Sequence, residues 1–211
     1  MNTLETNFLL LFLSNGRKNA SCYRIYDAEV MTEHSNESAV RELAAYLQDR
    51  SQKIDKIFLF SSQDTKKQLP GTDMTTVHFF ASRIKEIVTA ENIIIVDYNE
   101  NNSIDSSLSD IGNMGTIILS EAQKIQREQG AAGNITIHAD MTGGMRNASM
   151  MMLGVMRLLN FSGLQMGKIL YSNFSFNRKI NFVEDSQDVY RFFDLVAGAT
   201  EFAKYGSVEK L

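Results

Sequence analysis

The chain has 211 residues, of which 44% are hydrophobic, and a formal net charge of −4. This length fits one α/β domain with a sizeable core, and the acidic balance excludes a general basic surface for long DNA or RNA. The single cysteine, Cys22, excludes an internal disulfide and a Cys-x-x-Cys metal site. The apolar run 8–13 is too short to cross a membrane, and no basic segment of a signal peptide precedes it. We therefore expect a soluble cytoplasmic protein with no membrane partner.

In chain order, the first elements alternate between apolar runs and amphipathic segments. Residues 7–13 form a continuous apolar run, which predicts a strand buried on both faces as in parallel sheets. Residues 23–26 alternate and predict a short edge strand. Residues 36–48 carry apolar side chains at i, i+3, i+4 and i+7, the pattern of an amphipathic helix. Residues 56–60 predict a second buried strand.

The middle of the chain continues this alternation. Residues 77–88 predict a helix and 92–96 a third strand. The segment 97–113 is rich in Asn, Ser and Asp, which favours a loop, and it leads into a predicted helix at 116–129. Residues 135–138 predict the fourth strand.

A Met- and Leu-rich helix is predicted after this strand, ending near residue 160. We interpret its methionines as adaptable core or dimer packing. Residues 168–171 predict a fifth strand, 180–183 an edge strand and 187–204 a final amphipathic helix. The alternation of strands and helices predicts an α/β fold, a Rossmann-like, doubly wound and mainly parallel sheet with helices on both faces. We expect one domain over residues 1–211, which the last helix closes.

Polar residues collect directly after four of the predicted strands. In an open parallel sheet these positions share one edge, where ligands bind. The candidate ligand-binding residues are Ser14, Asn15, Gly16, Arg17 and Lys18; Ser61 and Ser62; Asp140, Thr142, Gly143, Gly144, Met145, Arg146 and Asn147; and Ser172.

The segment 138–149 is the most informative of these, because it joins a strand, a glycine turn and a helix. The first N–H groups of a helix have no intrahelical partner and attract anions, and glycine lets a phosphate approach the backbone. A purely structural interpretation is equally open, with Thr142 as the helix cap and the Asp140 carboxylate holding the turn. The spacing matches neither a P-loop nor a dinucleotide fingerprint.

The histidines His34, His78 and His138 are too scattered for metal-ligand spacing. We interpret His138 as a packed strand residue rather than a catalytic base. The sequence therefore predicts no metal site and no cofactor, and it assigns no catalytic residue.

Residues 137–146, Ile-His-Ala-Asp-Met-Thr-Gly-Gly-Met-Arg, resemble the Asp-x-Thr-x-Gly-x-Arg signature of CARF domains, the CRISPR-associated Rossmann-fold sensors. Three further segments are similar to that family in the same order. Residues 9–26 look like its first strand, ligand loop and tyrosine-rich strand; residues 168–174 look like the strand after the signature helix, and 193–211 like the closing helix. One departure is Gly143, where many relatives have His.

The resemblance implies a sensor of cyclic oligoadenylate, the second messenger of type III CRISPR antiviral defence, with cyclic tetra-adenylate as the preferred ring. It also implies a two-fold homodimer with the ring across the dyad. Hydroxyls and backbone N–H groups would bind phosphate and ribose, and Arg17, Lys18 and Arg146 would supply charge. Relatives carry an effector after the sensor, often a HEPN ribonuclease, whose Arg and His pattern is absent here. We therefore expect that the effector is missing or was cut from this chain.

Two alternatives remain open at this point. The first is a ring nuclease that cleaves the bound messenger without metal, by attack of a ribose 2′-hydroxyl in line with the phosphate. The second is a nucleotide- or cofactor-binding Rossmann enzyme unrelated to CRISPR. The missing fingerprint disfavours it, as do Ser61 and Ser62 where an acidic residue would end the second strand.

Overall fold

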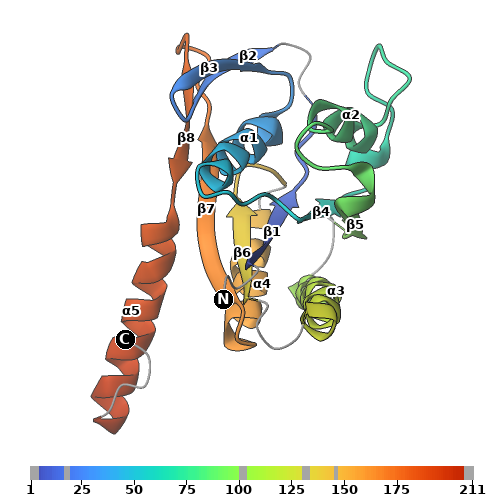
Figure 1. The fold of residues 1–211 in the computed structure, drawn as a ribbon. Helices are drawn as coiled ribbons and strands as arrows, with labels where there is room; N and C mark the ends of the chain where they lie inside the picture. The colour runs from blue at the N-terminus through green and yellow to red at the C-terminus, as the bar shows by residue number, and fades with distance from the viewer. Residues whose placement is uncertain (1–4, 17–19, 100–103, 130–133, 145–146, 207–211) are drawn as a thin grey trace.

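The first strand of the chain, β1 (Glu5–Phe12), lies in the middle of a large sheet (Figure 1). It pairs in parallel with β4 (Lys56–Ser61) on one side and with β6 (Asn134–Asp140) on the other. β5 (Ile93–Asp97) and β7 (Gln165–Asn173) extend the parallel part outward, which gives the order β5-β4-β1-β6-β7. The predicted Rossmann-like, mainly parallel sheet is confirmed. The computed structural model describes residues 5–16, 20–99, 104–129, 134–144 and 147–206.

Three strands extend the sheet beyond β7 and make it mixed. β8 (Asn181–Asp185) runs antiparallel to β7, and β2 (Ser21–Ile25) is parallel to β8. β3 (Ala28–Thr32) pairs antiparallel with β2 and forms the edge. The two predicted edge strands, 23–26 and 180–183, were therefore wrong in position, since both lie inside the sheet. A short alternating run looks the same whether it has one neighbour or two.

Helices cover both faces of the sheet, as predicted. α1 (Ser35–Gln48) and α2 (Thr76–Arg83) pack on one face, and α3 (Ile104–Gln129) and α4 (Ala148–Phe161) on the other (Figure 1). The side chains of β1 alternate between the two cores, because successive residues of a strand point to opposite faces. The side chains facing α3 and α4 are Phe8, Leu10 and Phe12, and those facing α1 and α2 are Leu9 and Leu11. Three methionines of α4 belong to the first of these cores, which confirms their packing role: Met151, Met152 and Met156.

The predicted loop 97–113 was wrong, because α3 begins at Ile104. Its serines and Gly112 lower helix propensity, which hid the start of the helix. Two other glycines lie at contacts between α3 and α4. A Cβ on Gly115 would lie 2.5 Å from Leu158 of α4, and a Cβ on Gly154 of α4 would lie 3.0 Å from Ile111. Small residues thus let α3 and α4 approach closely.

The second helix is shorter than predicted. α2 ends at Arg83, and the rest of the predicted segment, up to residue 88, folds into turns. Ile84 and Val88 are still buried in these turns. The periodic apolar pattern therefore predicted the buried residues correctly but overestimated the length of the helix.

α5 (Gln187–Tyr205) confirms the last predicted helix and extends away from the body of the molecule (Figure 1). Only Tyr190 and Gly198 are buried along its length. No helix in the described part of the chain is long and apolar enough to span a membrane.

Candidate functional site

The carboxyl ends of β1, β4, β6 and β7 lie on one edge of the sheet, because these strands are parallel neighbours. This confirms that the polar strand ends share an edge. After β1 the chain first forms the β2–β3 hairpin at the far edge of the sheet and then returns through α1 to β4 and β5 on one side of β1. It crosses through α3 to β6 and β7 on the other side. The carboxyl ends of β1 and β6 therefore flank the topological switch point, where open α/β sheets bind ligands.

The loop after β6 packs directly against the end of β1 at this point. A Cβ on Gly143 would lie 1.8 Å from the carbonyl oxygen of Phe12, so only glycine fits there. Gly144 has φ +92°, a conformation that L side chains rarely adopt, and a Cβ on it would lie 2.3 Å from that of Ala148. Both glycines thus have a packing role, and the turn they form places the 140–144 backbone at the switch point.

Asn36, in the first turn of α1, links the two strand ends. Its fully buried amide Nδ2 donates to the carbonyl oxygen of Phe12 at 3.1 Å and to Asp140 Oδ2 at 2.6 Å. Its Oδ1 accepts from the backbone N–H of Ser14 at 3.0 Å and from the Ser14 hydroxyl at 2.9 Å. One side chain therefore fixes the loop after β1 relative to the loop after β6.

A second chain of hydrogen bonds continues from Asp140 to the end of β7. Asp140 Oδ1 accepts from the backbone N–H of Thr142 at 2.8 Å, which confirms that this carboxylate holds the turn. Thr142 Oγ1 accepts from the backbone N–H of Ser172 at 2.9 Å, and the Ser172 hydroxyl lies 2.7 Å from that of Ser38 in α1. The polar ends of β1, β6 and β7 are thus joined to α1, and a network whose polar groups are paired is rigid.

The interpretation of Thr142 as a helix cap was wrong. α4 begins at Ala148 with Asn147 as its N-cap residue, and the Asn147 side chain makes no capping bond. Thr142 lies too far before the helix to cap it, and its hydroxyl oxygen contacts β7 instead.

His34 holds the start of α1 against the loop after β1. Its Nδ1 accepts from the backbone N–H of Asn36 at 3.2 Å, and its Nε2 lies 3.0 Å from the carbonyl oxygen of Ser14. This pairing requires a neutral ring with its proton on Nε2. The histidine is therefore a structural clamp at the switch point.

Burial sets the electrostatics of β6. It raises the pKa of Asp140 to about 6, against the opposing effect of the hydrogen bonds from Thr142 and Asn36. Burial also lowers the pKa of His138 to about 4. His138 Nε2 lies 3.1 Å from Asn7 Oδ1, and its Nδ1 accepts from the backbone N–H of Lys168 at 2.9 Å. This confirms His138 as a packed strand residue.

Ser61 and Ser62 form a separate cluster at the end of β4. The Ser61 hydroxyl lies 2.9 Å from Thr65 Oγ1, which donates to the carbonyl oxygen of Ser62 at 2.9 Å. Both serines are buried, and none of these bonds reaches the network at the switch point. Asn15 is exposed beside that network, and a Cβ on Gly16 would lie 3.2 Å from Leu69.

Four of the candidate residues lie outside the described part of the chain: Arg17, Lys18, Met145 and Arg146.

Sequence reasoning missed the residues of α1 that complete the network. Residues 34–38 are all buried although each of them is polar: His34, Ser35, Asn36, Glu37 and Ser38. A polar run before an amphipathic helix indicates a helix N-terminus, but it does not say that the polar side chains turn inward. Their burial follows only from the docking of α1 against β6 and β7.

The fold and its strand ends define a Rossmann-like α/β protein with a hydrogen-bonded polar site at the switch point. No group of three or more His, Cys, Asp or Glu side chains that could hold a metal ion occurs within the described residues.

No family model and no curated protein matches the chain. Among solved structures it is similar to Enterococcus italicus Csm6 bound to cyclic hexa-2′-fluoro-hexa-dAMP, with 12% sequence identity and a TM-score of 0.40. The alignment covers 98% of this chain and 42% of that one, so this chain spans less than half of the length of Csm6. A likeness of this degree assigns neither a ligand nor an activity to the chain.

Proposed function

We propose that this chain is a CARF-like sensor that binds a cyclic oligoadenylate, with cyclic tetra-adenylate preferred, across a two-fold homodimer. One observation carries the proposal. The loop after β1 and the signature loop after β6, which the CARF resemblance implies as ligand loops, meet at the switch point, where Gly143 lies against the carbonyl oxygen of Phe12.

The chemistry of this edge suits a phosphodiester ring. Backbone N–H groups at the start of α4 have no intrahelical partner, and they carry the positive end of the helix dipole. Gly144 is exposed next to Ala148, the first residue of α4, and Asn15 is exposed in the loop after β1. Arg17 and Lys18 follow the first loop in the sequence and Arg146 the second, so three cations accompany the two loops. Charged donors of this kind make the strongest hydrogen bonds to phosphate.

The proposed dimer follows from the symmetry of the ligand. A ring of identical nucleotides has rotational symmetry, so two identical sites that meet at a dyad can bind equivalent parts of it. The rigid network around Asn36 would keep each site in its binding geometry, which lowers the entropic cost of binding.

Titration of the purified chain with cyclic tri-, tetra- and hexa-adenylate tests the proposal. We expect binding of one ring per two chains, tightest for the tetramer and much weaker for linear tetra-adenylate. Isothermal titration calorimetry gives affinity and stoichiometry, and light scattering gives the oligomeric state. Chromatography of the incubated ligand would reveal linear products if the chain also cleaves the ring. Failure of all three rings to bind rejects the proposal.

Replacement of the signature arginine gives a matched pair of variants. Arg146→Ala removes a charged donor to phosphate and should weaken binding by about 10- to 150-fold, the equivalent of 1.5–3 kcal/mol. Arg191→Ala removes an exposed arginine of α5 and should leave the affinity unchanged. Equal affinities of the two variants would place the ligand elsewhere.

A further inference from the structure

A cavity of about 730 Å³ lies between the two hairpins at one end of the sheet. Ser21 and Met31 of the β2–β3 hairpin line one wall, and the turn from Phe174 to Asn181, between β7 and β8, lines the other. Its volume falls in the range of roughly 300–1,000 Å³ that is typical of small-molecule sites. We call this cavity the hairpin pocket.

The hairpin pocket is lined by an exposed aromatic side chain. Phe176 is 93% exposed, which is unusual for a phenylalanine. Phe174 contacts it edge-on, with ring centroids 4.8 Å apart and an interplanar angle of 83°. This contact holds the Phe176 ring at an angle while its exposed face stays available for a planar ligand.

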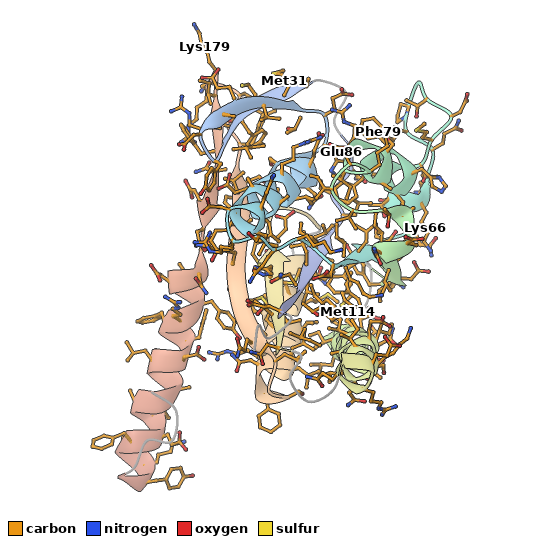
Figure 2. The ribbon with its side chains drawn as sticks, in the orientation of Figure 1. Met31, Lys66, Phe79, Glu86, Met114 and Lys179 are labelled. Atoms are coloured by element: carbon orange, nitrogen blue, oxygen red, sulfur yellow. The ribbon has the colours of Figure 1, made fainter. Side chains whose placement is uncertain are left out.

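Two cations line the same pocket, and the guanidinium carbon of one of them, Arg178, lies 5.9 Å from the centroid of the Phe182 ring of β8. Arg178 and Lys179 line the hairpin pocket, and neither forms an ion pair with a carboxylate in the described part of the chain. Figure 2 shows Lys179 at the tip of the β7–β8 hairpin, projecting away from the body and near the hairpin that carries Met31. On a chain of net charge −4, two exposed cations without a carboxylate partner form a local site for an anion.

A buried amide holds the turn in place. Asn181 is 2% exposed; its Oδ1 accepts from the backbone N–H of Ser175 at 2.8 Å, and its Nδ2 donates to the carbonyl oxygen of Cys22 at 3.2 Å. The Ser175 carbonyl oxygen in turn accepts from the backbone N–H of Arg178 at 3.2 Å. The ring and the cations are therefore carried by a turn that is fixed to β2.

The hairpin pocket lies on the same edge of the sheet as the candidate site. Phe174 directly follows the carboxyl end of β7, which contains Ser172 of the network. Ser21 begins β2, which starts at this edge because it runs antiparallel to β7 through β8. The first ligand loop leads into this strand, since only residues 17–20 separate Gly16 from Ser21.

We propose that the hairpin pocket is the base-binding subsite of the candidate site: an adenine of the bound ring stacks on Phe176, and its phosphate binds Arg178 and Lys179. This inference rests on the proposed function. An aromatic ring beside cations is the combination by which proteins bind single-stranded nucleotides, because every base has a face that can stack.

Cyclic tetra-adenylate with one adenine replaced by 2-aminopurine tests the stacking, because stacking quenches the fluorescence of that base. Phe176→Ala should raise Kd by about 5- to 150-fold, the range for loss of one stacked base, and should reduce the quenching. Phe176→Tyr keeps an aromatic face and should retain the wild-type Kd and quenching. Phe176→Leu should behave like Phe176→Ala. Phe161→Ala is the matched control, since Phe161 is 80% exposed at the end of α4.

The outcomes separate the inference from the proposed function. If the wild-type chain binds no ring, the proposed function fails. If it binds a ring and Phe176→Ala and Phe176→Leu match Phe161→Ala in affinity and quenching, only the base subsite is overturned. Because Phe176 is almost fully exposed, its variants should fold, and circular dichroism checks this.

The two cations are tested by the salt dependence of binding. Arg178→Gln and Lys179→Gln should each reduce the slope of log K against log salt by about 0.7, the value for one phosphate contact with a single strand. Lys204→Gln, on α5, should leave the slope unchanged. If the Arg178 and Lys179 variants have the same slope as Lys204→Gln, no phosphate of the ligand binds in the hairpin pocket.

Discussion

Asp140 and His138 are buried two residues apart on β6, and burial shifts both pKa values. The two shifts have opposite effects on how the free energy of unfolding changes with pH. The raised pKa of Asp140 means that the folded chain binds a proton more readily than the unfolded chain between about pH 4 and 6. Stability from this group therefore falls as pH rises through that window. The lowered pKa of His138 has the opposite sign, so its contribution is lost as pH falls from 6.5 to about 4. At 1.36 kcal/mol per pKa unit each effect amounts to about 3 kcal/mol, and the two nearly cancel.

Asp140→Asn should therefore make the protein sensitive to acid. With the carboxyl gone, the loss of stability from His138 between pH 6.5 and 4 is no longer compensated, and the free energy of unfolding should fall by about 3 kcal/mol more than in the wild type over this window. Urea unfolding followed by circular dichroism at several pH values measures the slope.

Asp188→Asn is the control for this slope, because the Asp188 side chain is 95% exposed. The variant Asp140→Asn also loses a hydrogen bond acceptor for Asn36 at every pH, so only the slope tests the prediction. Parallel pH profiles for Asp140→Asn and Asp188→Asn would contradict it.

At the scale of elements, the junction between β6 and α4 depends on the contact of Gly143 with β1. Gly143→Ala would place a Cβ 1.8 Å from the Phe12 carbonyl oxygen, and backbone has to move to relieve this clash. Overpacking of this kind costs roughly 1–3 kcal/mol or more, so we expect at least this loss in the free energy of unfolding, measured by urea denaturation.

Gly112→Ala is the matched substitution in α3. Nothing lies within 4 Å of a Cβ there, and alanine favours a helix over glycine by about 1 kcal/mol. This variant should therefore gain stability. A neutral or stabilising effect of Gly143→Ala would show that the loop after β6 is not pinned against β1.

The elements that sequence patterns predicted best are those with a continuous apolar run or a regular apolar spacing. The apolar runs became β1, β4 and β5, and the regular 3.6-residue spacing became α1 and α5. β3 was missed because Ala28–Thr32 is a short outer strand with mostly exposed or half-buried side chains, so no apolar pattern marks it. The start of α3 was missed because its serines and Gly112 lower helix propensity, while the contact of Ile111 with Gly154 of α4 joins residues far apart in sequence.

The residues of the candidate site also fall into those that the sequence predicts and those that only tertiary contacts reveal. The strand-end residues could be predicted, because parallel strands bring their carboxyl ends to one edge. Asn36, the centre of the hydrogen-bond network, could not, since its partner Asp140 lies 104 residues away in sequence. Phe176 was missed as well, because the exposure of an aromatic side chain depends on which elements cover it.

At the scale of the whole molecule, α5 stands apart from the other helices. It exposes large apolar side chains along its length, including Phe192, Leu195 and Phe202. It is attached near its start, where the Ser186 N–H donates to the Ile169 carbonyl oxygen at 2.6 Å, and Arg157 of α4 forms an ion pair with Asp194.

The amide hydrogens of α5 should consequently exchange faster than those of α4, because few buried contacts oppose local opening. Hydrogen exchange with mass spectrometry measures this, and Asp194→Ala should speed the exchange of α5 further while leaving α4 unchanged. Protection of α5 equal to that of α4, or rising with protein concentration, would contradict the prediction and show that another surface covers the helix.

The central position of β1 has a consequence for synthesis. β1 leaves the ribosome before its neighbour β6, which begins only at Asn134. At roughly 5–20 residues per second, the interval from Phe12 to Asn134 lasts on the order of 6–25 s. During that time this strand, which is buried at every residue but Glu5 in the folded protein, has an open hydrogen-bonding edge, a template for wrong pairing. Nascent chains of this protein should therefore need a holding chaperone until β6 emerges.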